Sequence, residues 1–293
     1  MKSNLLLRSI TGILFVVVLV AAIVSGPYSF GFLFAIITGL TTWEFCSILN
    51  KNQGVQINKL ITTAAAVIFF FSVYGYFAIG IYLGPIGLGF FFPLFLTILY
   101  LLISELYTKS ETPIQNWAYA LMALFYIALP FGLFSILTIS YVFNSGIPVY
   151  VHRSIFALSI FIFLWSSDTG AYIFGVWLGK HRLFPRISPK KSWEGSVGGT
   201  VVALAASQII AIWSNDFAPD DAVLNRLYWA GLAFVVVVFG TWGDLVESLL
   251  KRKLGIKDSG NILPGHGGML DRFDSSLVAI PAAVVYIYSI SLI

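Results

Sequence analysis

Long apolar segments, separated by short polar connections, make up almost the whole chain. A helix that spans a bilayer needs about 20 mostly apolar residues, and nine segments meet this criterion. The pattern therefore predicts an all-α, polytopic integral membrane protein with about nine transmembrane helices. Pro130, inside the fifth segment, is predicted to kink its helix. The predicted spans are Leu6–Val24, Tyr28–Leu49, Leu60–Ile79, Pro85–Ile103, Trp117–Ser140, Ser154–Leu178, Gly195–Trp213, Leu227–Leu250 and Phe273–Leu292.

The basic residues of the connections indicate the orientation of these helices. With the N-terminus in the cytoplasm, fifteen of the 17 Lys and Arg residues lie in cytoplasmic segments, and only Arg153 and Arg226 lie on the other side. Positive charge concentrates on the cytoplasmic side of membrane proteins, so we expect a cytoplasmic N-terminus and a C-terminus on the opposite side. The first span follows Lys2 and Arg8 as a signal peptide would, but it lacks a convincing cleavage site and is interpreted as a retained helix.

Composition excludes a soluble protein. The 293 residues are 58% hydrophobic and only 10% charged, with a mean hydropathy of +0.90, whereas a soluble domain has about 25% charged residues. Lipid must therefore surround most of the chain, and no nucleic-acid partner is expected. The single cysteine, Cys46, has no disulfide partner and is interpreted as a small buried apolar residue.

Polar residues concentrate after Ser154. We therefore divide the chain into residues 1–150, a scaffold of five helices, and residues 151–293, four helices with catalytic loops in the cytoplasm. Two acidic residues stand out in the first part. Glu44 lies deep in a predicted span, where a structural pair, a helix-end interaction and a site role are all open. Glu105 lies at a helix end and is expected to be solvated.

Several charged residues of the second part lie inside predicted spans. Asp168 is expected to face a polar cavity, with a hydrogen-bonded structural carboxyl as the alternative. Asp244, Glu247, Ser248 and Lys251 are spaced to share one helix face. Two carboxylates one turn apart in apolar surroundings need compensation. Mg²⁺ would provide it, as would an ion pair with Lys251 or a neighbouring helix.

The loop before the seventh span is strongly basic. Ser188, followed by proline, predicts the N-cap of a helix, which places Lys190 and Lys191 in its first turn. An anion bound there would offset the unfavourable interaction with the helix dipole; contact with anionic lipid is the alternative. Gly195 and Gly199, spaced four apart, favour close helix packing.

The loop after the eighth span combines cations, glycines and carboxylates. His266 lies within Pro264–Gly268, where glycine allows backbone amides to approach an anion. Asp271 and Asp274 open the last span, where acidic residues favour the helix dipole. They are interpreted either as caps or, for Asp271, as a metal ligand shared with Asp244.

This loop resembles the signature of the phosphatidate cytidylyltransferase (CDP-diacylglycerol synthase) family without a gap. The similar segments 168–172 and 188–195 extend the resemblance over about residues 165–274. The matching signature positions are Ser248, Lys251, Arg252, Lys257, Asp258, Gly260, Pro264–Gly268, Asp271, Arg272 and Asp274.

The resemblance implies the transfer of a cytidylyl group from CTP to phosphatidate, giving CDP-diacylglycerol and pyrophosphate. It implies Mg²⁺ at Asp244 and Asp271 and leaves a second cation open, while the helix spacing adds Glu247 as a further candidate ligand. It also implies a homodimer in the bacterial cytoplasmic (inner) membrane, and the distribution of basic residues predicts a site that faces the cytoplasm. The implied catalytic residues are Asp244, Asp271, Lys257, Arg272 and His266, of which His266 has a structural role in the loop as its alternative. The implied substrate-binding residues are Asp168, Tyr172, Ser188, Lys190, Lys191, Ser248, Lys251, Arg252, Asp258, Gly267 and Gly268.

An ion-coupled transporter of an anionic or phosphorylated substrate is the competing function, since deep carboxylates and a proline within a span also occur in carriers. Carriers often contain inverted repeats, and the chain shows no internal repeat.

Overall fold

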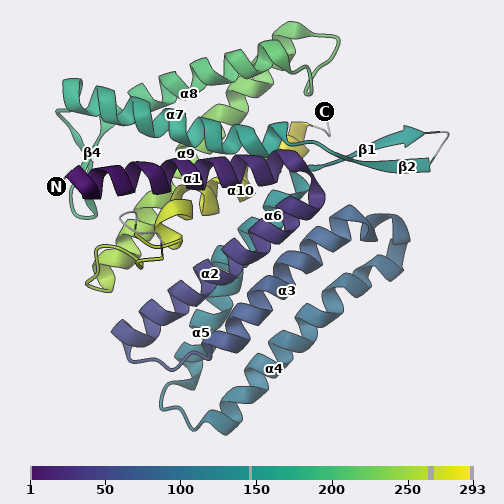
Figure 1. The fold of residues 1–293 in the computed structure, drawn as a ribbon, viewed down its shortest axis with the longest axis vertical. Coiled ribbons are helices and arrows are strands. Elements are labelled where there is room, and N and C mark those ends of the chain that lie inside the picture. The colour runs from purple at the N-terminus through teal and green to yellow at the C-terminus, as the bar shows by residue number, and fades with distance from the viewer. Residues whose placement is uncertain (1, 145–146, 263–266, 291–293) are drawn as a thin grey trace. The chain divides into compact units, whose positions relative to one another are not determined.

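The computed structural model describes residues 2–144, 147–262 and 267–290, and helices make up most of them (Figure 1). Two short antiparallel hairpins, which the sequence did not predict, complete the described structure. In chain order the elements are α1 (Lys2–Ser25), α2 (Pro27–Gln53), α3 (Lys59–Ala78), η1 (Gly80–Phe91), α4 (Phe92–Thr108), α5 (Pro113–Ala123), η2 (Leu124–Ala128), α6 (Leu129–Ile136), β1 (Ile139–Asn144), β2 (Ile147–His152), α7 (Ile155–Leu178), β3 (Arg182–Phe184), β4 (Ser188–Ser192), α8 (Trp193–Trp213), α9 (Ala222–Lys253) and α10 (Leu270–Ile290).

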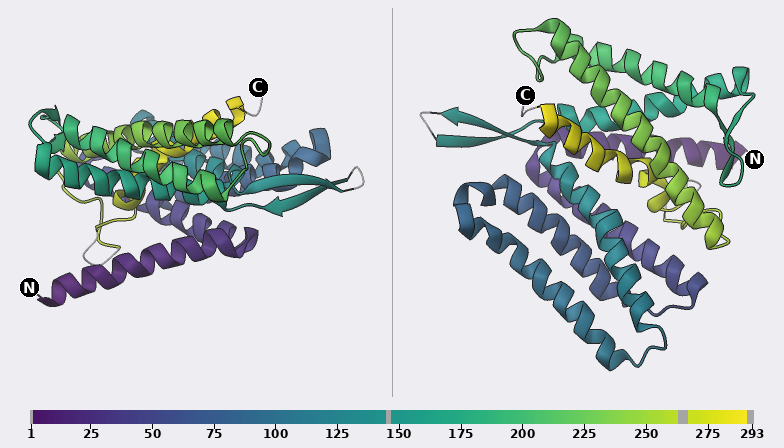
Figure 2. Two further views of the ribbon diagram at one scale, coloured as in Figure 1. Left: turned by 90° about the horizontal axis from the view of Figure 1, so that it is seen from above. Right: turned by 180° about the vertical axis from the view of Figure 1, so that it is seen from behind.

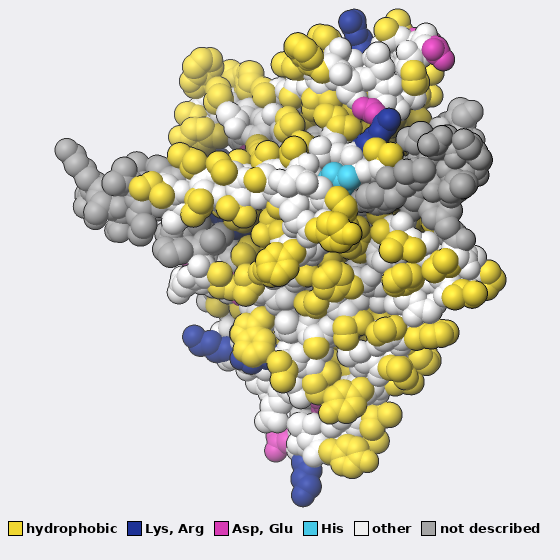
Figure 3. Space-filling view, turned by 45° about the vertical axis from the view of Figure 1, so that its right-hand side comes forward, with side chains coloured by type: hydrophobic (Ala, Val, Ile, Leu, Met, Phe, Trp, Pro, Cys, Tyr) yellow, Lys and Arg dark blue, Asp and Glu magenta, His cyan; other side chains and the backbone are white. Residues whose placement is uncertain are grey.

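Eight helical segments in the described ranges are long and apolar enough to cross a bilayer, and α1 adds a shorter apolar stretch, Ile10–Ser25. The face in Figure 3 is covered mainly by hydrophobic side chains, with few charged ones. Exposed side chains of this kind, such as Phe95, Phe125 and Ile209, suit contact with lipid. The predicted polytopic, mainly α-helical membrane fold is confirmed, while the ninth span and the sides of the termini stay predictions.

Contacts divide the chain into two compact units. The first unit comprises Met1–Ser154 and Lys253–Phe273, and the second comprises Ile155–Arg252 and Asp274–Ile293. The chain therefore returns to the first unit after α9 and leaves it again within the first turn of α10. The division of function at residue 150 stays a prediction.

Aromatic side chains fill the core of the first unit. Phe34 contacts Phe134, with ring centroids 4.9 Å apart, and Phe131 contacts Phe273 edge-on at 5.2 Å. All four rings are fully buried. Edge-to-face and tilted contacts of this kind add to the free energy gained by burying the rings. They tie α2 and α6 to the start of α10 within this unit.

The fifth predicted span departs from a regular helix in two places. Leu124–Ala128 form a π-helical turn directly before Pro130, the second residue of α6. Proline lacks an N–H and clashes with the carbonyl four residues earlier in an α-helix, and a wider turn relieves both problems. The predicted end at Ser140 is wrong, because the helix ends at Ile136 and β1 then pairs with β2. The β-branched and aromatic residues of Ile139–Asn144 favour an extended strand.

The predicted burial is right for Cys46 and wrong for Glu105, two residues of the first unit. Cys46 is buried, as predicted. Glu105 was expected to be solvated, and this is wrong: its side chain is buried and accepts a hydrogen bond of 3.1 Å from the Asn116 amide. The Asn116 carbonyl oxygen accepts a further bond from the Gln56 N–H, so this buried carboxylate belongs to a polar network that joins α4, α5 and the connection between α2 and α3.

Candidate active site

The second unit is built on two helices that approach very closely. A Cβ atom at Gly199 of α8 would lie 2.5 Å from the Ser167 carbonyl oxygen of α7, and one at Gly195 would lie 2.8 Å from the Ala171 carbonyl oxygen. Only glycine permits this approach. The predicted close packing at these two glycines is confirmed, and α7 and α8 lie side by side in both views of Figure 2.

The basic loop between α7 and α8 forms a short hairpin of β3 and β4, not a helix start at Ser188. Ser192, in extended conformation, is the N-cap of α8, and its hydroxyl accepts a hydrogen bond from the Gly195 N–H. Ser188 opens β4 instead, so the prediction of Lys190 and Lys191 in a first helical turn is wrong. The side chain of Ser192 is closer to the apolar segment and caps it, which leaves the preceding residues free to pair as a strand.

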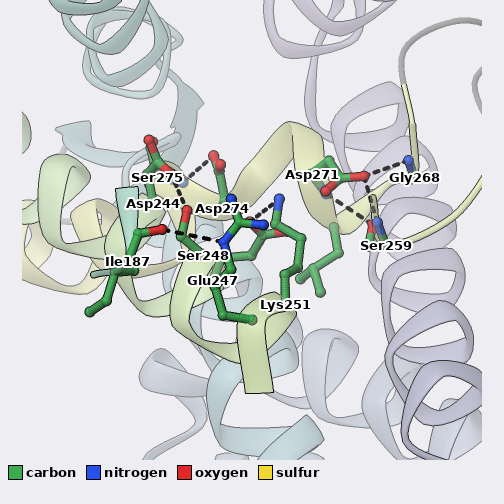
Figure 4. Close-up of polar contacts among 12 residues, drawn as sticks. Ile187, Asp244, Glu247, Ser248, Lys251, Ser259, Gly268, Asp271, Asp274 and Ser275 are labelled. Carbon is green, nitrogen blue, oxygen red and sulfur yellow. Dashed lines mark hydrogen bonds and ion pairs between the residues drawn. The ribbon is translucent and has the colours of Figure 1, made fainter. Parts of the chain in front are cut away.

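Three carboxylates meet where α9 approaches α10. A Cβ atom at Gly243 would lie 2.6 Å from the Asp274 carbonyl oxygen, so glycine again allows two backbones to come close. Asp244, Glu247 and Asp274 each offer an oxygen, and these oxygens lie within 4.8 Å of one another. The residues are labelled in Figure 4. Hard oxygen donors at this spacing suit a divalent cation.

Cationic and hydroxyl groups surround this acidic cluster. Lys191 of β4 forms an ion pair with Asp244, and Lys251 pairs with Glu247 at 2.5 Å. The Ser248 hydroxyl donates a hydrogen bond of 3.1 Å to Asp244. The pairs along α9 confirm that these predicted residues share one helix face. Since Glu247 is fully buried, compensation of its charge is necessary for the fold.

A cavity of about 220 Å³ opens beside the cluster in the second unit. Such a volume is below the roughly 300–1,000 Å³ of sites for drug-sized ligands, and it suits a phosphate group better than a whole nucleotide. Its polar lining consists of Ser167, Asp168, Tyr172, Lys190, Lys191, Ser192, Ser196, Thr241 and Ser275.

A second group of predicted residues lies in the first unit. Lys257 and Asp258 line a cavity of about 590 Å³ together with residues of α2. Asp271 accepts hydrogen bonds on one carboxylate oxygen from the Ser259 N–H at 2.9 Å and the Gly268 N–H at 2.8 Å. Asp271 therefore holds the loop before its helix, as the capping interpretation expected.

The predicted site residues thus fall into two groups. Asp168, Tyr172, Ser188, Lys190, Lys191, Asp244, Glu247, Ser248, Lys251 and Arg252 belong to the second unit, and Lys257, Asp258, Gly267, Gly268, Asp271 and Arg272 to the first. Arg252 donates to the Ile187 carbonyl at 3.4 Å. His266 lies outside the described residues. A metal shared by Asp244 and Asp271 stays a prediction.

Sequence reasoning missed Asp274 as a candidate metal ligand. It assigned both aspartates at the start of α10 to capping and singled out Asp271 for the metal. The positions of the two aspartates in the helix could have distinguished their roles. Asp271, in the first turn, can reach back to loop amides, whereas Asp274 lies one turn further into the apolar helix, where a carboxylate needs another partner.

Residues 6–290 match the cytidylyltransferase family. The chain belongs to this family. The family resemblance noted for residues 165–274 is therefore confirmed.

Curated relatives carry the name phosphatidate cytidylyltransferase. That of Staphylococcus saprophyticus is 43% identical over 153 residues, which are 50% of this chain and 56% of the relative. That of Staphylococcus haemolyticus is 40% identical over 176 residues, covering 59% and 60%. That of Haemophilus influenzae is 42% identical over 130 residues, or 44% of each chain. The chain spans less than two thirds of the length of these relatives.

Proposed function

We propose that the protein transfers the cytidylyl group of CTP to phosphatidate, producing CDP-diacylglycerol and pyrophosphate in phospholipid biosynthesis. The main support for the proposal is that positive and negative side chains lie next to one another at the small cavity. Lys190 and Lys191 line the cavity, and Lys191 forms an ion pair with Asp244, one of the three clustered carboxylates. Phosphoryl transfer requires cations for phosphate oxygens next to carboxylates that can hold a metal. The named relatives support the choice of substrates.

In the proposed reaction, a phosphate oxygen of phosphatidate attacks the α-phosphorus of CTP. A new P–O bond forms, the bond from the α-phosphorus to the bridging oxygen breaks, and pyrophosphate leaves with the bonding electrons. The nucleophile is already an anion, so no side chain has to remove a proton. The protein must position two anions and stabilise charge on their oxygens. Lys190 and Lys191, at the cavity wall, supply this positive charge.

The acidic cluster fits a magnesium ion. Its three carboxylates are hard oxygen donors close enough together to act on one cation. Asp244, Glu247 and Asp274 would hold the ion, and a bound divalent cation supplies positive charge for phosphate oxygens. Lys191 and Lys251 balance the negative charge of the cluster. The roles of Asp271 as a ligand and of a second cation are separate parts of this proposal.

The site must meet a water-soluble nucleotide and a membrane lipid together. A polar cavity among apolar helices serves this purpose, with acyl chains remaining in lipid and CTP entering from water. We propose that the site lies on the cytoplasmic side of a bacterial inner membrane. The loop that carries Lys190 and Lys191 is rich in basic residues, and basic residues concentrate in the cytoplasmic loops of membrane proteins. The homodimer is a further part of the proposal.

A single assay tests this function. Purified protein is incubated with phosphatidate, Mg²⁺ and CTP labelled at the α-phosphate. We expect labelled lipid and pyrophosphate in equal amounts, and about 10³-fold less of both from an Asp244→Asn variant that is folded. Wild-type protein that takes up or binds an anion without forming these products would contradict the enzyme and support the transporter.

A further inference from the structure

Glu44, in the middle of α2, is a buried carboxylate with 5% of its surface exposed. Three donors from a distant part of the sequence bind it. The Ser259 hydroxyl donates to one carboxylate oxygen, the Met269 N–H donates to the other at 2.9 Å, and the Leu270 N–H donates at 3.2 Å. All four residues belong to the first unit. Glu44 thus satisfies donors that would otherwise be buried without a partner.

These donors come from two parts of one connection and from the first residue of α10. We call residues 254–269, between α9 and α10, the signature loop; its described residues are 254–262 and 267–269. Ser259 belongs to the first described part, and Met269 closes the second. The Glu44 carboxylate therefore links the two described parts of the loop to each other and to α2.

Two glycines make room for this carboxylate. A Cβ atom at Gly260 would lie 2.7 Å from a Glu44 carboxylate oxygen, and one at Gly268 would collide with both the Glu44 carboxylate and the Ser259 hydroxyl. Both glycines belong to the signature loop. Their role here is close approach of backbone to a side chain, whereas the sequence alone attributed Gly268 to approach of a ligand.

Asp271 strengthens the same connection. It accepts from the Ser259 and Gly268 amides, as drawn in Figure 4, while its own N–H donates to the Ser259 hydroxyl at 3.3 Å. Ser259 therefore links Glu44 to Asp271. Polar networks in a low-dielectric interior hold a single arrangement when each member has its partners.

The signature loop also forms one wall of the larger cavity. Lys257 and Asp258 line it together with Trp43, Glu44 and Lys51 of α2. We infer that Glu44 is a positioning residue, which anchors the signature loop so that Lys257 is held ready for the nucleotide phosphates. This inference rests on the proposed function for its substrate. The anchoring itself rests on the hydrogen bonds alone.

A carboxylate is required because all three partners are donors. An ionised carboxylate has only acceptors, whereas glutamine presents one oxygen and an NH₂ group. In Glu44→Gln, this NH₂ group faces an N–H or O–H donor of the loop. At least one loop donor then loses its partner although the side chain keeps its size.

Hydrogen exchange of the full-length protein in lipid nanodiscs tests the anchor directly. We expect Glu44→Gln to increase the exchange rates of the Met269 and Leu270 amides about tenfold or more. Glu105→Gln is the matched control, since Glu105 is also a buried carboxylate of the first unit but bonds Asn116. It should leave these two rates unchanged. Unchanged rates in Glu44→Gln would overturn the anchor whatever the activity.

Measurement of KM and kcat then distinguishes a positioning role of Glu44 from a general loss of stability. We expect Glu44→Gln to raise the KM for CTP about tenfold or more while kcat changes less, and Glu105→Gln to change neither. If Glu44→Gln does not fold, Ser259→Ala is the second test, since it removes one of the three donors. It should also increase the exchange rates of the Met269 and Leu270 amides and raise the KM for CTP. A lower kcat with normal KM would overturn the positioning role. Inactive wild-type protein with the expected exchange rates would overturn the proposed function and leave the anchor standing.

Discussion

The ammonium group of Lys191 forms an ion pair with the carboxylate of Asp244, which joins β4 to α9. Both side chains keep more than a quarter of their surface exposed, and Lys191 lines the small cavity, where a substrate phosphate can reach it. The lysine can therefore serve both the acidic cluster and an incoming anion.

Replacement of Lys191 tests this double role. We expect Lys191→Met to lower kcat/KM for CTP about 100-fold, because a preorganised charge for phosphate oxygens is lost, and Lys191→Arg to retain part of the activity. The labelled-CTP assay measures both. Lys109→Met, at an exposed position of the other unit, should behave as wild type. Equal activity of Lys191→Met and wild type would show that the ion pair is only structural.

The acidic cluster should determine the response to magnesium. Chelation of divalent cations should abolish product formation, and added Mg²⁺ should restore it. Asp244→Asn and Asp274→Asn should each lower turnover about 10³-fold, since several kcal/mol of charge stabilisation depend on the metal. Activity is measured over a Mg²⁺ titration, with helical content by circular dichroism as the control for folding. A normal titration curve for Asp274→Asn would remove that residue from the metal site.

Asp271→Asn separates two roles of one side chain. The Ser259 and Gly268 amides both donate to a single oxygen of Asp271, and the asparagine oxygen can accept both bonds. The loop should therefore stay in place while the negative charge is lost. We expect turnover to be abolished with the fold retained, as a metal ligand requires. Normal turnover would leave Asp271 as a cap and refute the metal shared with Asp244.

Helix packing in the second unit predicts a stability effect. Gly199→Ala would place a methyl group 2.5 Å from the Ser167 carbonyl oxygen, and we expect it to lower the free energy of unfolding by about 1–3 kcal/mol. Gly89→Ala is the control, because no heavy atom lies within 4 Å of its added Cβ. Thermal unfolding in detergent compares the two. An equal transition temperature for both variants would contradict close packing of α7 and α8.

The helices could be predicted because lipid imposes a simple rule. Long apolar segments must be helical to satisfy their backbone groups, so most predicted spans match observed helices within a few residues. The rule fails where the chain leaves the apolar region. Beyond Ile136 and at Ser188, short strands compete with helix, and their pairing depends on residues elsewhere in the loop that a local pattern does not reveal.

The sequence was sufficient to predict which kinds of residue form the site, but only some of the contacts between them. The spacing of Asp244, Glu247 and Lys251 on one helix gave their shared face, because helical periodicity is local. Asp274 and Glu44 act through contacts between segments distant in sequence. Glu44 in particular was one acidic residue in an apolar span, and its three donors lie more than 200 positions away.

That separation has a consequence for biosynthesis. Glu44 and Ser259 are 215 positions apart, and at about 5–20 residues per second a ribosome needs roughly 10–40 s to translate the chain between them. Throughout that interval α2 is already synthesised while its carboxylate has none of these three donors. Because the first unit includes residues of the signature loop, it can complete its contacts only after that loop has been made, long after its first helices have emerged.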